Sequence, residues 1–106
     1  MNKFQKQVDD FMKEKGWPYW QPLSILARLF EECGEFAREV NHKDGEKKKK
    51  ETEKNSSIED EIGDIIFTLI CFANSNNINL DDCFKKSFTK VQARDKNRFK
   101  KDLINK

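Results

Sequence analysis

The sequence predicts an all-α protein in which four helices form a bundle. Apolar residues recur at spacings of three and four along most of the 106 residues, and no segment sustains the alternation of a strand. Nine Phe and two Trp offset a hydrophobic content of only 36% and supply the bulky groups of a folded core. A chain of this length is expected to form a single domain over residues 1–106 with one small hydrophobic core.

The first two helices are marked by their ends as well as by their apolar stripes. The first is expected over residues 2–15, because Gly16 ends helices readily. After the linker WPYWQ, the second begins near Pro22, which suits a first helical turn, and runs to about Asn41. Its apolar stripe consists of Ile25, Leu26, Leu29, Phe30, Cys33, Phe36, Ala37 and Val40.

Residues 42–56 carry no apolar side chain and are expected to form a solvated loop. A capping box then opens a third helix, either Ser56 with Glu59 or Ser57 with Asp60, and this helix continues to about Ser75. Its apolar residues cover most of its circumference, so we expect it to be buried on several sides.

The fourth helix is expected to be capped by Asn79 and to continue to about Phe99, before a basic tail at about 100–106. The residues expected to face inward from this helix are Leu80, Cys83, Phe84, Ser87, Phe88 and Val91. We find no internal repeat and no second domain in the sequence.

Composition excludes several classes of protein. The 21 basic and 19 acidic residues nearly balance, and the acids occupy the central helices, so no nucleic-acid surface is predicted. The longest apolar run, IIFTLICFA, is too short to span a membrane, and the charged N-terminus is unlike a secretory signal. Cys33, Cys71 and Cys83 have no CxxC spacing and are interpreted as buried, reduced packing residues of a cytoplasmic protein.

Carboxylates are concentrated on the two central helices. Glu31, Glu32 and Glu35 lie within about a third of the circumference of the second helix, at 100° per residue. Glu61 and Asp64 repeat the i, i+3 spacing on the third helix. Glu61 also shares a face with the apolar residues that follow it, which places it at the edge of the buried stripe.

Buried carboxylates are costly unless they are paired or bind a cation. Arg28 and Arg38 are too few to neutralise these acids. Oxygen ligands without Cys or His favour Mg²⁺, or Mn²⁺, over Zn²⁺, since the only histidine, His42, lies at the end of its helix and out of register. A di-iron bundle is disfavoured because it requires Glu-x-x-His. An isolated Glu in so charged a chain would be interpreted as a surface acid, but two such pairs favour a metal site.

Three segments together resemble the MazG-like nucleotide pyrophosphohydrolases, in particular their short, single-domain bacterial members. They are PLSILARLFEECGEFAREVNH, EDEIGDIIFTLICFANS after a charged loop, and FTKVQARDKNRF. The resemblance implies an all-α fold completed by homo-oligomerisation, as a dimer or tetramer. It also implies Mg²⁺-dependent hydrolysis of nucleoside triphosphates to the monophosphate and pyrophosphate, as nucleotide-pool house-cleaning.

The resemblance also implies roles for individual residues. Glu31, Glu32 and Glu35 match the EExxE motif and are the candidate catalytic residues, while Glu61 and Asp64 match ExxD. Glu32, Glu35, Glu61 and Asp64 would bind the metal directly. Glu31 would bind it through a water or orient the attacking water.

Further candidates concern the substrate. Lys90, Arg94 and Asn97 recur at i, i+4, i+7 on the fourth helix. Their pattern alone fits a solvated face as well as a phosphate site, and with the resemblance they are expected to hold phosphate. Trp17, Tyr19 and Trp20 form an aromatic cluster that either stacks on the base, with Trp20 as the best candidate, or closes the end of the bundle. The alternative function is a non-catalytic helical module that binds a metal or a partner.

Overall fold

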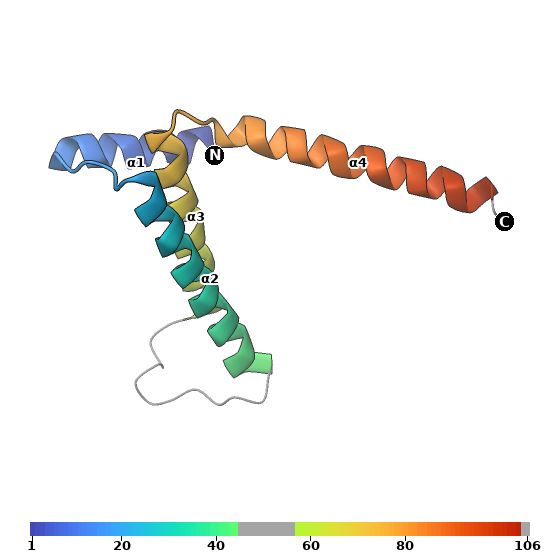
Figure 1. The fold of residues 1–106 in the computed structure, drawn as a ribbon, viewed down its shortest axis with the longest axis horizontal. Coiled ribbons are helices and arrows are strands. Elements are labelled where there is room, and N and C mark those ends of the chain that lie inside the picture. The colour runs from blue at the N-terminus through green and yellow to red at the C-terminus, as the bar shows by residue number, and fades with distance from the viewer. Residues whose placement is uncertain (45–56, 105–106) are drawn as a thin grey trace.

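The computed structural model describes residues 1–44 and 57–104, with side chains described as far as Lys96 in the last helix. Within these ranges the protein is all-helical, as predicted. Its elements are α1 (Asn2–Lys15), α2 (Pro22–Asp44), α3 (Ile58–Ser75) and α4 (Leu80–Ile104), shown in Figure 1.

The end of α1 is fixed by Gly16. Its φ of 68° lies in the left-handed region that glycine adopts without steric cost. The Gly16 N–H donates to the Lys13 carbonyl at 3.1 Å, and the Trp17 N–H donates to the Met12 carbonyl at 3.0 Å. The predicted bounds of this helix, 2–15, are therefore confirmed, and the chain is turned toward α2.

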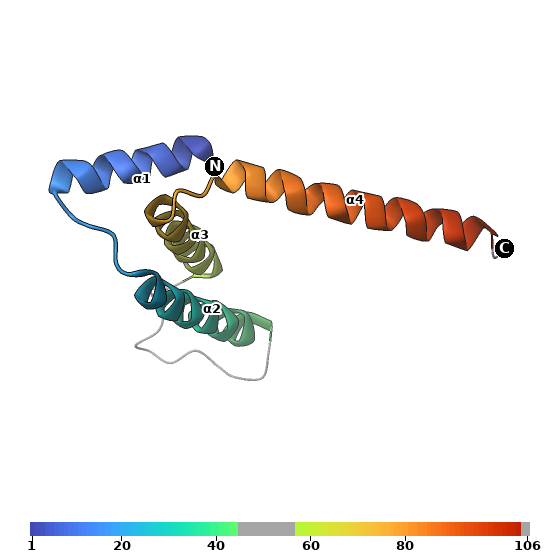
Figure 2. The ribbon, with the colours of Figure 1, turned by 45° about the horizontal axis from the view of Figure 1, so that its top comes forward.

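Helices α2 and α3 lie side by side in both views and run in opposite directions (Figures 1 and 2). Ile25 of α2 and Ile70 and Ala73 of α3 are the buried apolar residues of this small core. Because α2 continues to Asp44, residues 42–44 are helical and not part of the loop expected at 42–56. Residues 45–56, including the candidate cap Ser56, lie outside the described residues.

The cap of α3 is Ser57, whose Oγ accepts a hydrogen bond from the Asp60 N–H at 3.1 Å. This is the second of the two predicted capping alternatives. The cap starts α3 so that Glu61 lies in its first turn and faces inward, where only 4% of its surface is exposed. The prediction that Glu61 lies at a buried edge is thus confirmed.

Helix α4 leads away from the other three (Figures 1 and 2). Asn79 caps it as predicted, because its Oδ1 accepts from the Asp82 N–H at 3.1 Å. The prediction that Phe84, Phe88 and Val91 pack inward is wrong within one chain, since all three are exposed. The predicted end near Phe99 is also wrong, since the helix continues to Ile104 and includes most of the expected tail. No Gly or Pro follows Phe99 to end it.

Apolar side chains remain exposed on the other helices as well. They include Leu23, Leu26 and Phe30 on α2 and Ile62, Ile66 and Leu69 on α3. The expectation that α3 is covered on several sides is therefore not met within one chain. Cys33 and Cys83 are exposed too, which contradicts their predicted burial, whereas Cys71 is half-buried and all three are free thiols.

No helix in the described part of the chain is both long enough and apolar enough to cross a membrane.

Candidate metal centre

Four carboxylates from α2 and α3 meet between the two helices. Each helix contributes a pair at i, i+3, which places both acids of a pair on one face. One carboxylate oxygen from each of Glu32, Glu35, Glu61 and Asp64 lies within 4.8 Å of the others. They are the four acids that the resemblance implied as direct metal ligands, and we refer to them as the carboxylate cluster.

The cluster is buried on one side and open on the other. Only 2% of the Glu32 surface is exposed, Glu35 is half-buried and Asp64 is exposed. Arg28, one turn earlier on α2, approaches Glu32 Oε1 with its Nε at 2.7 Å. The second oxygen of Glu32, Oε2, and the Oε2 atom of Glu61 are buried without a hydrogen-bond donor in the described structure. Two acceptor atoms in this cluster thus lack the positive partner that buried oxygens require.

The pKa of Glu61 is raised to about 7, first by burial and then by the neighbouring carboxylates of Glu35, Asp64 and Glu32. Burial also raises the pKa of Glu32; the charge of Glu35 adds to this effect, and Arg28 opposes it. One arginine therefore does not balance the negative charge of the cluster, and a proton or a cation is needed.

The donor set fits a hard divalent cation. All four side chains offer carboxylate oxygens, which suit Mg²⁺ or Mn²⁺. His42 lies further along α2, with its Nδ1 3.9 Å from Glu39 Oε1, and is not part of the cluster. Cys33 is exposed and is also outside it. Soft and imidazole ligands are therefore absent from this site within the described residues.

Glu31 does not join the cluster. Its side chain is exposed, although it is next in sequence to the buried Glu32. Adjacent residues on a helix are 100° apart, so both cannot face α3. Asp60, which precedes Glu61, is likewise exposed and outside the cluster.

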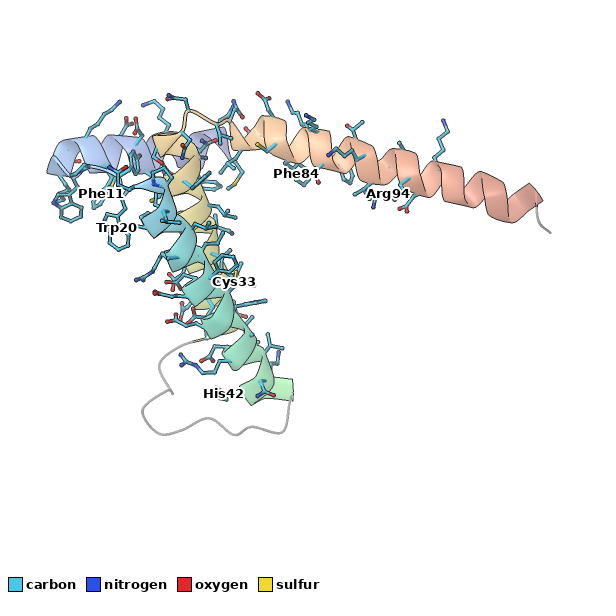
Figure 3. All side chains as sticks on the ribbon, viewed as in Figure 1. Phe11, Trp20, Cys33, His42, Phe84 and Arg94 are labelled. Carbon is cyan, nitrogen blue, oxygen red and sulfur yellow. The ribbon has the colours of Figure 1, made fainter. Side chains whose placement is uncertain are left out.

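A cleft of about 600 Å³ opens beside the cluster. Arg28, Glu32 and Asp64 line it on the side of the cluster. The rest of its lining is mainly apolar and aromatic and consists of Phe11, Met12, Trp17, Pro18, Tyr19, Trp20, Ile25, Phe67, Thr68 and Cys71. Figure 3 shows Phe11 and Trp20 near the end of α1 and the start of α2.

Sequence reasoning selected the aromatic linker residues Trp17, Tyr19 and Trp20 but missed the apolar lining that α1 and α3 contribute. Phe67, Thr68 and Cys71 were not connected with the site, because Phe67 and Cys71 are predicted as packing residues and Thr68 only as a residue on the same face as Glu61. Their spacing from Asp64, at i+3, i+4 and i+7, places them on the same line of the helix. That spacing was the available signal that they continue the site.

The expected phosphate-binding residues are not brought to the cluster within one chain. Lys90 and Arg94 are exposed on α4, and Figure 3 shows Arg94 near the middle of the projecting helix. The side chain of Asn97 lies outside the described part of the structure.

Comparison with known proteins agrees with these motifs. Residues 20–99 match the model of the MazG nucleotide pyrophosphohydrolase domain. YpjD of Bacillus subtilis (strain 168) is 46% identical over 99 residues, which cover 93% of this chain and 89% of YpjD. YvdC of the same organism is 27% identical over 96 residues, covering 85% of this chain and 91% of YvdC.

Two solved structures share the fold at high sequence identity. The crystal structure of B. subtilis YpjD aligns with a TM-score of 0.78 and 44% identity, over 89% of this chain and 94% of that one. The crystal structure of the Bacillus-conserved MazG protein, a nucleotide pyrophosphohydrolase, aligns with a TM-score of 0.69 and 42% identity, over 85% of this chain and 86% of that one. The resemblance expected from the sequence is thereby confirmed.

Proposed function

The chain belongs to the MazG nucleotide pyrophosphohydrolase family, and on that premise we propose that it hydrolyses nucleoside triphosphates to the monophosphate and pyrophosphate. We further propose that the reaction depends on Mg²⁺, or Mn²⁺, and removes unwanted nucleotides from the cytoplasmic pool. The observation that carries this proposal is the carboxylate cluster, in which two buried oxygens lack a donor beside an aromatic cleft.

Glu32, Glu35, Glu61 and Asp64 are the residues that would hold the cation. When bound, a divalent ion offsets the charge of phosphate oxygens and lowers the pKa of water. The ion would also supply the positive charge that Glu32 Oε2 and Glu61 Oε2 lack in the described structure.

The chain's own side chains would handle the proton and the substrate. A carboxylate of the cluster accepts the proton of the attacking water, which displaces pyrophosphate from the α-phosphorus. Glu31, exposed on α2 next to Glu32, orients this water or binds the ion through a water. Arg28 lines the cleft and is the cationic side chain of this chain that lies beside the cluster.

The aromatic part of the cleft would hold the base. Its volume of about 600 Å³ is within the ordinary range for small-molecule sites. Trp20 lines it with 61% of its surface exposed, so its ring is available to stack on a base.

A second copy of the chain would complete the site. The exposed apolar faces of α2, α3 and α4 support a homo-oligomer, a dimer or tetramer, because a monomer rarely exposes so much apolar surface. Since α4 leads away from its own cluster, we propose that Lys90, Arg94 and Asn97 bind phosphate in the site of another copy. Basic side chains there would hold the leaving pyrophosphate.

The direct test is a panel of ribo- and deoxyribonucleoside triphosphates incubated with Mg²⁺, with the release of monophosphate and pyrophosphate measured. We expect both products in equal amounts from at least one nucleotide. Release of orthophosphate, or no product from any member of the panel, would contradict the proposal. Stabilisation by Mg²⁺ without turnover would favour the non-catalytic metal-binding module instead.

The variants Glu35→Ala and Asp64→Ala test the assignment of the cluster. We expect each to lower kcat/KM by at least about a hundredfold, or about 2.7 kcal/mol, because each removes a ligand. Neither should unfold the protein, since each relieves repulsion among the carboxylates. Glu14→Ala, which removes an exposed acid on α1, is the matched control and should leave turnover unchanged. Equal activity in all three variants would refute the assignment.

A further inference from the structure

The aromatic wall of the cleft is a short segment without regular structure. Trp17, Pro18, Tyr19 and Trp20 connect α1 to α2, and all four line the cleft. The two indoles are more than half exposed, and the Trp17 ring packs edge-on against Phe11 with centroids 5.8 Å apart. Exposed rings on an irregular segment need a separate anchor if they are to keep one position.

Tyr19 supplies that anchor through its hydroxyl group. The hydroxyl donates to Asp9 Oδ1 of α1 at 2.9 Å and accepts from Asn74 Nδ2 of α3 at 3.0 Å. Asn74 Nδ2 also donates to the Gln5 carbonyl at 3.0 Å, and Asn74 Oδ1 accepts from Gln5 Nε2 at 3.1 Å. The segment is therefore tied to two helices at one point.

The Tyr19 hydroxyl is the donor and the Asp9 carboxylate the acceptor, because Tyr19 is protonated and Asp9 is ionised. Burial raises the pKa of Tyr19 to about 12, so the hydroxyl keeps its proton at neutral pH. The Lys13 ammonium first, and then the Tyr19 hydroxyl, hold the pKa of Asp9 below its usual value, so Asp9 stays an ionised acceptor. A charge-assisted bond of this kind is stronger than a neutral one.

The network connects the cleft wall to the metal site. Asn74 and Asp64 both belong to α3, so the Tyr19–Asn74 bond fixes the aromatic segment relative to the carboxylate cluster. We propose that Tyr19 is a positioning residue for substrate binding, which holds Trp17 and Trp20 where a nucleobase stacks while the triphosphate reaches the cluster. This inference rests on the proposed function. Its physical basis is preorganisation, because a segment that is already ordered loses less entropy when the substrate binds.

The variant Tyr19→Phe keeps the ring and removes both hydrogen bonds. We expect KM for the best nucleotide of the panel to rise about tenfold, equivalent to about 1.4 kcal/mol, with kcat changed less than about twofold. Binding of that nucleotide, followed by tryptophan fluorescence with Ca²⁺ in place of Mg²⁺, should weaken by the same factor. The Mg²⁺ dependence of thermal unfolding should match that of the wild type, because the cluster is untouched.

Two further variants separate positioning from general stability. Lys6→Ala removes an exposed ion pair of the same kind from α1, in which Lys6 Nζ lies 2.7 Å from Asp10 Oδ2, and should leave KM unchanged. Asn74→Ala should raise KM as Tyr19→Phe does, and the double variant should add little, because both changes break the same network.

Each outcome decides between the two proposals. If the wild type binds and hydrolyses nucleotides but Tyr19→Phe has the same KM and the same affinity, this inference is wrong and the proposed function stands. If Tyr19→Phe lowers kcat while KM is unchanged, the residue acts on the chemical step and positioning is refuted. If the wild type neither binds nor hydrolyses any nucleotide, the proposed function and this inference both fail.

Discussion

Glu61 is the residue whose environment most clearly indicates a missing positive charge. It is buried, one of its oxygens has no donor in the described structure, and three other carboxylates surround it. Its pKa of about 7 means that, without a cation, the site takes up a proton at neutral pH. Cation binding and proton binding therefore compete at the same oxygens.

This competition makes the stability of the metal-free protein depend on pH. The folded-state pKa of Glu61 is raised from 4.5 to about 7, so the folded protein binds the proton more tightly than the unfolded chain does. The free energy of unfolding should therefore fall as pH rises from about 4.5 to about 7, and Glu32 contributes in the same direction. Asp9 and Asp81 have pKa values lowered from 3.8, so they change the free energy of unfolding mainly at pH values below this window.

Urea unfolding with a chelator, repeated across that pH window, measures the effect. The variant Glu61→Gln, which cannot ionise, should show a clearly weaker dependence than the wild type. An identical slope in the two proteins would show that Glu61 is not buried among like charges.

Helical spacing predicts that the acids of each central helix share a face, and the resemblance to the MazG-like family implies that Glu32, Glu35, Glu61 and Asp64 bind the metal directly. The exposure of Glu31 was not predicted, since the EExxE motif does not reveal which of two adjacent acids faces the neighbouring helix. The hydrogen bonds of Tyr19 could not be predicted either, because Asp9 and Asn74 meet it only through the packing of α1 and α3.

At the scale of elements, the sequence predicts helix ends well where a specific residue determines them. Gly16 ends α1, Ser57 begins α3 and Asn79 begins α4, each through backbone or capping hydrogen bonds. The ends of α2 and α4 were predicted too early, because polar residues such as Lys and Asp can continue a helix when no Gly or Pro interrupts it.

The apolar stripe of α4 was predicted correctly as a stripe but assigned to the wrong neighbours. Phe84 and Phe88 stack on each other, with centroids 5.6 Å apart and planes 9° from parallel, and remain exposed. Periodicity shows that a face is apolar. It does not show whether the surface that covers it belongs to the same chain.

At the scale of the whole molecule, three helices form one packed unit and the fourth projects from it (Figures 1 and 2). The start of α4 is held to the start of α1, because the N-terminal ammonium lies 2.7 Å from Asp81 Oδ1 and Leu80 N–H donates to Gln5 Oε1 at 2.9 Å. These contacts fix the direction in which α4 leaves. A helix held in that direction suits contact with another copy.

Mixing two inactive variants tests whether the copies share their sites. Asp64→Ala removes a ligand from its own cluster, and Arg94→Ala removes a phosphate contact that we assign to another copy. If the subunits are unfolded together in equal amounts and refolded, a shared site should recover about one quarter of wild-type activity, because one site in four then has both residues intact. Each variant refolded alone is the control. No recovery in the mixture would mean that Arg94 acts in the site of its own chain, and an active Arg94→Ala control would mean that Arg94 has no role in the site.

The central claim is that the carboxylate cluster binds a divalent cation, and thermal unfolding with and without Mg²⁺ tests it most directly. At a concentration about tenfold above Kd, binding stabilises the fold by about 1.4 kcal/mol, which raises Tm by roughly 5–10 °C in a domain of this size. Asp64→Asn should be at least as stable as the wild type without Mg²⁺ and should lose most of the Mg²⁺-dependent increase. A wild-type Tm that does not change at millimolar Mg²⁺, or an equal increase in the variant, would contradict the account.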